Sequence, residues 1–229
     1  MKPPPDRLYG RVRGHPLRPR QHALLAHALP RLRLAPGAAG DPLAAFPRRP
    51  ARLLLEIGFG GGEHAAAQAE RDGDAGLIAC EVFENGICSL LSRLVPEPLD
   101  PLSAPLPPNL LLWPDDARAL LRLLPEACLD GVFLLFPDPW PKARHAKRRF
   151  VHPEIVPLVA RAMRPGAAWR VASDDPTYQA WVGEVMDAQS LFSAPPPART
   201  RPEAWPPTRY EAKALAAGRA PLYWSFMRL

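Results

Sequence analysis

A glycine-rich stretch, LLLEIGFGGGEH at residues 53–64, is the most informative local pattern in this chain. Its apolar half runs into the glycines, which is typical of a buried parallel strand that ends in a tight turn. Gly58, Gly60, Gly61 and Gly62 let the backbone turn sharply and approach a ligand closely. The residues after the glycines, EHAAAQAE, indicate a helix. The stretch therefore predicts a strand, a ligand-binding turn and a helix, in that order.

Strands and helices alternate through the rest of the sequence. Further strands are expected at 77–82, 109–113, 130–136 and 167–174, and a last one within 221–229. Helices are expected at 85–94, 116–124, 152–163 and 176–188. This alternation predicts an α/β fold in which a mostly parallel sheet has helices on both faces. Ligands of such folds bind outside the carboxyl ends of the strands, so acids at predicted strand ends should meet at one rim.

Residues 1–50 differ from the rest because they are basic and rich in proline. The stretch 7–21 has five arginines and no acid, a short apolar helix is expected at 22–29, and residues 35–50 have the composition of a linker. We therefore predict an amino-terminal arm and linker at 1–50 and a folded domain at 51–229. The arm either binds phosphates or is a solvated tail, and its composition suits both interpretations.

The overall composition favours a basic protein of the cytoplasm. The formal net charge of +6 makes nucleic acid a reasonable partner, although arginine is abundant everywhere and local clusters are more informative. The three cysteines and six histidines show no metal-ligand spacing, so no metal is expected. The chain starts without an apolar signal segment, and no apolar run approaches the ~20 residues of a membrane span.

Two acids point to the kind of ligand that the glycine turn holds. Glu81 follows Glu56 by 25 residues and ends the second predicted strand. An acid at that place can accept both ribose hydroxyls of an adenosine. A dinucleotide fingerprint, GxGxxG, fails because Glu63 replaces the last glycine, and an acid there repels a pyrophosphate. Glu56, just before the glycines, suits a positive amine or sulfonium, so the pattern favours S-adenosylmethionine over NAD.

Two adjacent acids, Asp115 and Asp116, follow the third predicted strand. One of them can accept a hydrogen bond from an adenine amine, and the other can cap the helix that comes next. A cap without any ligand contact explains the pair equally well, so both interpretations stay open at this point.

The stretch FPDPWPKARHAKRRF, residues 136–150, places one acid among prolines and five cations directly behind it. Pro139 pushes Asp138 toward an extended conformation, and each proline fixes its own φ, so the loop loses little entropy on ordering. This stiffness suggests that Asp138 is a positioned functional group. The dense cations behind it need counterions, which the phosphates of a nucleic acid would supply. Trp140 either stacks on a base or packs against the protein.

Three stretches resemble the bacterial tRNA (guanine-N7)-methyltransferases, namely LLLEIGFGGGEH, LLFPDPWPKARHAKRRFVHPE and PPTRYEAKALAAGR. The resemblance covers roughly residues 51–229, and LYGRVRGHPLRP is similar to the amino-terminal arm of some members. It implies a Rossmann-like methyltransferase domain, S-adenosylmethionine as methyl donor and a guanosine in the tRNA variable loop as acceptor.

Residue by residue, the resemblance implies a cofactor site of four acids, of which Asp138 is also the catalytic residue. The four acids are Glu56, Glu81, Asp116 and Asp138. The choice of Asp116 over Asp115 rests on the family's Asp-Ala step. The positions linked to tRNA are Lys142, Asp174, Thr208, Arg209, Tyr210 and Glu211. Lys213, Ala214 and Arg219 depart from the family's frequent residues, which affects only the fine contacts of the carboxyl-terminal loop.

Two other functions compete with this interpretation. An amino-group methyltransferase uses an Asp/Asn-Pro-Pro-aromatic motif at the same rim, but here the second proline follows Trp140 instead of preceding it. A non-catalytic RNA-binding protein that has kept the fold is the other alternative. Mapping the methylated atom distinguishes a ring nitrogen from an exocyclic amine and so tests the first alternative. Binding of S-adenosylmethionine without methyl transfer to tRNA would support the second.

Overall fold

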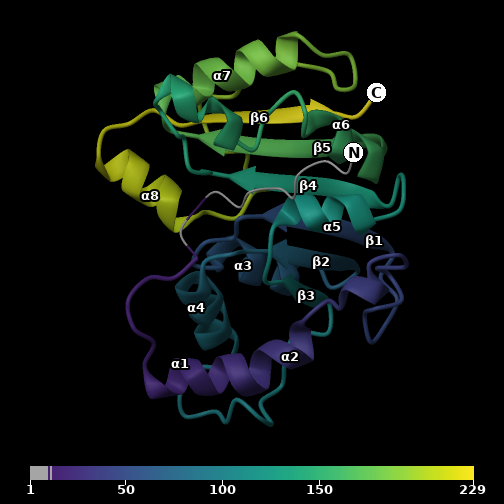
Figure 1. Ribbon diagram of the computed structural model, residues 1–229, viewed down its shortest axis with the longest axis vertical. Helices are drawn as coiled ribbons and strands as arrows, with labels where there is room; N and C mark the ends of the chain where they lie inside the picture. Colours follow the sequence, from purple (N-terminus) through teal and green to yellow (C-terminus); the bar gives the residue numbers. More distant parts are fainter. Residues whose placement is uncertain (1–9, 11) are drawn as a thin grey trace.

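The computed structural model describes residue 10 and residues 12–229, and it contains one six-stranded sheet with helices on both sides (Figure 1). The strands are β1 Arg52–Ile57, β2 Ala75–Cys80, β3 Leu110–Trp113, β4 Leu129–Leu135, β5 Met163–Ser173 and β6 Leu222–Met227. The order across the sheet is β3-β2-β1-β4-β5-β6, with β6 antiparallel to β5 and the other pairs parallel. The predicted mostly parallel α/β sheet is confirmed.

The strand order reverses between β1 and β4. Glu56 of β1 lies opposite Ala79 of β2 on one side and opposite Phe133 of β4 on the other. In open α/β sheets the ligand crevice forms at such a reversal, outside the carboxyl ends of the strands. The glycine turn that follows β1 and the proline loop (residues 136–141) that follows β4 both begin at this edge.

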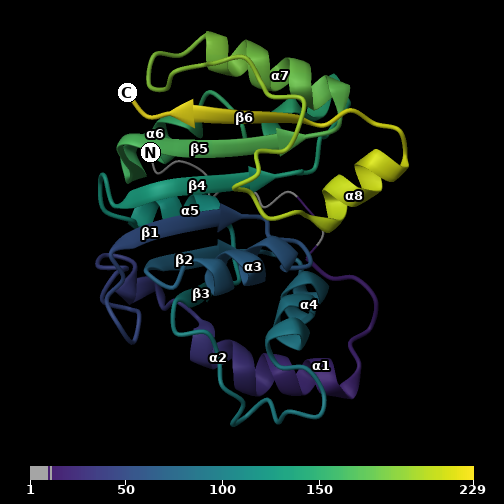
Figure 2. The ribbon, with the colours of Figure 1, turned by 180° about the vertical axis from the view of Figure 1, so that it is seen from behind.

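Helices cover both faces of the sheet, as Figures 1 and 2 show from opposite sides. One face carries α5 Ala117–Leu123, α6 Val156–Ala162 and α7 Pro176–Asp187, and the other carries α3 Glu63–Arg71 and α4 Glu84–Leu94. The last helix, α8 Arg209–Ala216, lies near the carboxyl ends of the parallel strands (Figure 2). Two short 3₁₀ helices span Pro36–Ala38 and Ala143–Arg148.

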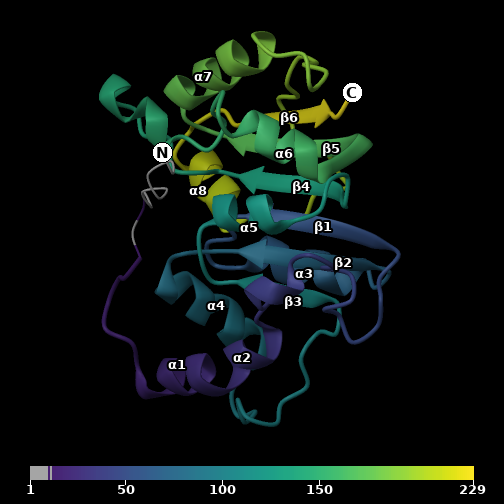
Figure 3. The same cartoon turned by 45° about the vertical axis from the view of Figure 1, so that its right-hand side comes forward.

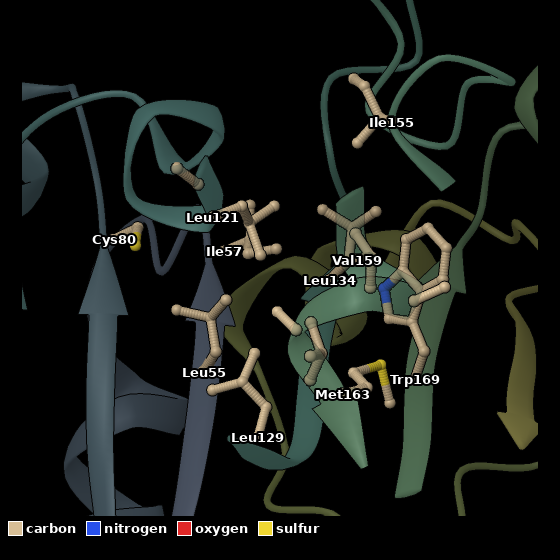
Figure 4. Packing of buried hydrophobic residues seen from close by; sticks show 14 of the residues in the cluster. Leu55, Ile57, Cys80, Leu121, Leu129, Leu134, Ile155, Val159, Met163 and Trp169 are labelled. Atoms are coloured by element: carbon tan, nitrogen blue, oxygen red, sulfur yellow. The ribbon is translucent and has the colours of Figure 1, made fainter. Parts of the chain in front are cut away.

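Alternating side chains of the strands divide the core between the two faces. Leu55 and Ile57 of β1 pack with Leu121 and Leu134 in the layer under α5 and α6 (Figure 4). Leu54 points to the opposite face, toward α3 and α4. Burying one such leucine is worth about 1.5–3 kcal/mol, so the two layers fix which way each strand faces. Glu56 shares the face of Leu54, and its carboxylate is therefore buried under α3.

The amino-terminal segment packs against this domain. A helical run made of α1 Pro19–Ala23, a π-helical part Leu24–Ala28 and α2 Leu29–Leu32 lies beside α4 (Figure 3). The backbone N–H of Leu34 donates to the carbonyl of Leu112 in β3, and Phe46 is buried. Residues of the predicted linker thus share the core with residues after 51, and the division at residue 50 stays a prediction. The part of the arm in residues 1–9 and Arg11 lie outside the described residues.

Two elements differ from the expectation. The helix expected over 152–163 is shorter, because the chain enters β5 at Met163, before Pro165 and Gly166. Helix α8 was not expected as a helix at all. Its first turn is capped by Thr208, whose side chain accepts the backbone N–H of Glu211. None of the helices in the described part of the chain has the length and apolar character that a bilayer span requires.

Candidate active site

A cavity of about 550 Å³ opens at the carboxyl ends of the parallel strands. Its walls come from the glycine turn, the ends of β2 and β3, the proline loop and α8. Among the residues that the sequence singled out, Glu81, Asp116, Asp138 and Tyr210 line it together with Asp115. Glu56, Lys142 and Asp174 do not line it. The predicted gathering of acids at one rim therefore holds for three of the four, and Glu56 lies below the rim.

The glycine turn is shaped by backbone conformations that other residues rarely adopt. Gly60 has φ +58° and Gly62 has φ +78°, both in the left-handed region. A Cβ on Gly62 would approach Leu90 to 2.5 Å, and one on Gly60 would approach the ring of Tyr210 to 2.8 Å. Gly62 begins α3 at its N-cap. The turn therefore leaves no room for side chains at Gly60 and Gly62, and it brings the backbone of Gly58 and Gly60 to the cavity wall.

Glu81 is held by the backbone on three sides. Its Oε2 accepts the N–H of Gly60 at 2.7 Å, and its Oε1 accepts those of Val82 at 2.8 Å and Phe83 at 2.9 Å. Burial raises the pKa of Glu81 above its usual value, the three hydrogen bonds oppose that rise, and the charge of Asp138 adds to it. The carboxylate is thus fixed in place but only partly solvated. A ligand hydroxyl that donates a further hydrogen bond would therefore be favoured.

Glu56 is buried beneath the turn and paired with a histidine. Its side chain is 3% exposed, and its Oε2 lies 2.9 Å from Nδ1 of His64, which is 2% exposed. The ring of His64 also meets the edge of Phe133, with 4.7 Å between the ring centres. This pair could not be expected from the sequence, because His64 belongs to the helix after the turn and shows no motif of its own.

Asp116 caps α5 and also holds an arginine. Its Oδ1 accepts the backbone N–H of Arg118 at 2.9 Å, and its carboxylate accepts the Arg118 guanidinium at 2.5–3.0 Å. Asp115 is exposed and lines the same cavity. The cap expected from the sequence is therefore present, whereas the choice of Asp116 for the adenine amine stays a prediction.

The proline loop holds Asp138 at the surface of the cavity in a strained backbone. Phe136 has φ +52° and Trp140 has φ +43°, a conformation that is costly for residues with large side chains. Arg149 stabilises the loop by donating to the carbonyls of Pro139 at 3.1 Å and Trp140 at 3.0 Å. Asp138 itself is exposed.

Arg149 corrects one expectation about the cations behind Asp138. We expected all five to face a nucleic acid, but Arg149 is only 4% exposed, and its guanidinium stacks 4.9 Å from the ring of Trp181. The other four cations belong to the basic segment, residues 142–148. Most of this segment forms the 3₁₀ helix Ala143–Arg148. Lys142, Arg144 and Lys147 are exposed there.

Trp140 packs within the protein as well as lining the cavity. The guanidinium of Arg148 lies 4.8 Å from its ring centre, and the ring of His145 meets it edge-on at 5.8 Å. Partial burial and the charges of Arg148, Arg144 and Lys142 lower the pKa of His145. The packing role considered for Trp140 is therefore present, whereas stacking on a base stays a prediction.

The carboxyl-terminal residues linked to tRNA divide into exposed and buried ones. Arg209 and Tyr210 are exposed at the start of α8, and Arg209 lies 3.8 Å from Glu63. Glu211 is buried and accepts hydrogen bonds from Arg201 at 3.0 Å and from the hydroxyl of Tyr223 at 2.7 Å. Its carboxylate points into the protein and anchors α8. Asp174 is paired with Arg219, the residue that departs from the family pattern.

The residues around the cavity fit S-adenosylmethionine. The glycine turn gives close backbone approach, and Glu81 offers a fixed carboxylate whose burial favours hydroxyl donors. Glu56 places negative charge beneath the turn, where a positive amine or sulfonium would be favoured. In the described part of the chain, no three His, Cys, Asp or Glu side chains are arranged to hold a metal ion.

Solved structures of other proteins share this fold. The 16S rRNA methyltransferase KamB aligns with a TM-score of 0.57 and 17% identity over 82% of this chain and 92% of that one. A 16S rRNA (adenine(1408)-N(1))-methyltransferase variant from Catenulisporales acidiphilia aligns with a TM-score of 0.55 and 14% identity over 86% and 92%. At these identities the likeness shows a shared fold, which confirms the Rossmann-like methyltransferase architecture.

Sequence comparison identifies the family. Residues 50–222 match the family described as "Putative methyltransferase". A tRNA (guanine-N(7)-)-methyltransferase of Granulibacter bethesdensis is 66% identical over 100% of this chain and 97% of its own length. One of the same name from Paramagnetospirillum magneticum is 44% identical over 97% and 92%. The chain therefore belongs to the family of tRNA (guanine-N7)-methyltransferases.

Proposed function

We propose that this protein transfers a methyl group from S-adenosylmethionine to N7 of a guanosine in the variable loop of tRNA. The observation that best supports this is the sharing of one cavity by Glu81, Asp138 and the glycine turn, with the basic segment directly behind Asp138. The curated relatives that carry this activity in their names match the chain over nearly its whole length. Because tRNA is modified where it is used, the proposal includes a cytoplasmic location.

The cofactor would be held by the four acids that the family resemblance implies. Glu81 would accept ribose hydroxyls, since its position is fixed by three backbone donors. Asp116, at the N-cap of α5, would accept a hydrogen bond from the adenine amine through a carboxylate lone pair that Arg118 does not use. Glu56 would act on the positive amino-acid end from beneath the turn. Asp138 would face the junction between cofactor and base.

The chemistry requires orientation more than proton transfer. S-adenosylmethionine supplies a methyl group activated by a sulfonium. Guanine N7 has a lone pair and no proton at neutral pH, so no general base is needed. Correct placement of the reactants can supply about 7–11 kcal/mol of the barrier reduction. We assign Asp138 to orienting the base and to balancing the positive charge that develops on the guanine ring.

The position of N7 limits where in the RNA the enzyme can act. N7 lies on the major-groove edge, and that groove in A-form RNA is too deep and narrow for side chains to read. A guanosine in a loop or a distorted region meets this requirement. Lys142, together with exposed Arg144 and Lys147, would bind nearby phosphates. Asp174, Thr208, Arg209 and Tyr210 would approach the RNA from the other side of the cavity, and buried Glu211 would act by anchoring α8.

The direct test is labelled methyl transfer to tRNA that lacks modifications, followed by mapping of the methylated base and atom. We expect the labelled methyl group of S-adenosylmethionine on a guanosine in the variable loop. The RNA chain should become cleavable at that guanosine, as is typical of N7-methylguanosine. Label on an exocyclic amine would support the amino-group methyltransferase instead. Tight binding of cofactor and tRNA without label would support a non-catalytic RNA-binding protein.

A further inference from the structure

Glu56 and His64 form a buried polar pair, and the proposed function assigns a role to Glu56 but none to His64. Both side chains are almost completely buried, and Nδ1 of His64 lies 2.9 Å from Oε2 of Glu56. They sit on the sheet face below α3, and β4 contributes Phe133, whose ring meets the imidazole. The glycine turn connects the two residues along the chain, so the pair lies directly under the cofactor-binding backbone.

The hydrogen-bond roles in this pair follow from its chemistry. An ionised carboxylate only accepts hydrogen bonds, so in the arrangement that attracts a positive ligand Nδ1 of His64 is the donor and Oε2 of Glu56 is the acceptor. Nε2 of His64 is buried and has no partner among the described residues. Among the described side chains, His64 is the one that forms a hydrogen bond with Glu56. One oxygen, Oε2, is engaged, and the other is left for another donor.

A comparison with Glu81 shows why this single contact matters. Glu81 accepts three backbone N–H groups, so its carboxylate is oriented by the chain itself. Glu56 depends on one side chain for orientation and for compensation of its burial. Without that donor, a buried carboxylate is left unsatisfied, and it either moves or takes up a proton.

We propose that His64 is a positioning residue for the cofactor, which fixes the ionised carboxylate of Glu56 so that it attracts the α-ammonium group of S-adenosylmethionine. The inference rests on the proposed cofactor role of Glu56 and assigns His64, for which no role was expected. In this arrangement His64 makes no contact with the cofactor. It acts through Glu56, and its effect should be confined to ligands that have the ammonium group.

Two ligands without a transferable methyl group separate this role from a general packing role. S-adenosylhomocysteine keeps the amino-acid part, whereas 5′-methylthioadenosine keeps the adenosine and the sulfur but lacks it. We expect His64→Leu to weaken binding of S-adenosylhomocysteine by about tenfold or more, the scale of one hydrogen bond to a charged group. Binding of 5′-methylthioadenosine should change by no more than about twofold. Both affinities are measured by calorimetry on the full-length protein.

Three further variants complete the experiment. His64→Asn places an amide N–H near the position of Nδ1 and should restore most of the affinity for S-adenosylhomocysteine. Gln68→Leu removes another buried polar side chain of α3 one turn later and should leave both affinities unchanged. In a Glu56→Gln background, adding His64→Leu should cause no further loss, because the two residues act as one unit. If His64→Leu does not fold, His64→Met, which also lacks a hydrogen-bond donor, replaces it with the same expected result.

The outcomes are distinguishable from a failure of the proposed function. Equal weakening of both ligands by His64→Leu, or no weakening of either, would overturn the positioning role. An additive effect of His64→Leu in the Glu56→Gln background would overturn it as well. A wild-type protein that binds neither ligand would instead contradict the proposed use of S-adenosylmethionine.

Discussion

The two sides of the cavity hold their carboxylates by different means. On the cofactor side, Glu81 is partly buried and fixed by three backbone N–H groups of the glycine turn and the chain after β2. On the substrate side, Asp138 is exposed in a proline loop, and the contacts that restrain this loop come largely from one side chain, Arg149. The position of Glu81 should therefore depend little on neighbouring side chains, whereas the position of Asp138 should depend strongly on Arg149.

The largest effect is expected for Asp138→Asn, which removes charge from the substrate side while keeping the shape. Methyl transfer in a single turnover should fall on the order of 100-fold, the scale seen when one group that stabilises a transition-state charge is removed. Folding and affinity for tRNA should stay close to those of the wild type, because the loop keeps its contacts. Asp187→Asn, an exposed acid at the end of α7, is the matched control. A wild-type rate for Asp138→Asn would eliminate its proposed role.

Arg149→Met tests whether one side chain supports the proline loop. The change leaves the carbonyls of Pro139 and Trp140 without their donor and removes the stacking on Trp181. We expect a loss of about 2–3 kcal/mol in the free energy of unfolding, measured by denaturant titration, and a slower methyl transfer. Lys147→Met, two residues earlier and exposed, should leave stability unchanged. If the two variants unfold at the same denaturant concentration, the loop is held by other contacts.

Acidification probes the cofactor side. Burial raises the pKa of Glu81 in the folded protein, so its ionised form is disfavoured there relative to the unfolded chain. Its contribution to stability is therefore more favourable at low pH and is lost as pH rises through the folded pKa. Binding needs the ionised acceptor, so on acidification the affinity for S-adenosylhomocysteine should begin to fall at a higher pH than an ordinary glutamate would give. Glu81→Gln should bind more weakly at neutral pH and lose this pH dependence, and a persisting slope would assign it to another group.

The same contrast explains which parts of the molecule could be predicted from sequence. The strands, the glycine turn and the rim position of Asp138 follow from periodicity and from the rule that ligands bind at the carboxyl ends of parallel strands. The burial of Arg149 was unpredictable, because nothing in a run of five cations distinguishes the one that turns inward to two carbonyls. The buried contacts of Glu211 and His64 could not be predicted for a related reason, since their partners lie on other parts of the chain. Helix α8 lacked an apolar stripe long enough to indicate it.

The smallest effect is expected from the exposed cations of the basic segment. Replacing Arg144 and Lys147 by Gln removes two exposed charges that form no ion pair with an acid in the described part of the chain. Each neutralised phosphate contributes about 0.7–0.9 to the slope of log affinity against log salt. The tRNA affinity should therefore fall a few-fold at moderate salt, and the slope should become shallower by about 1–2. At saturating tRNA the rate of methyl transfer should stay at the wild-type value, because these side chains attract the RNA without touching the reacting atoms. An unchanged slope would mean that the RNA backbone crosses the protein elsewhere, and the substrate side of the cavity would then consist of the proline loop and α8 alone.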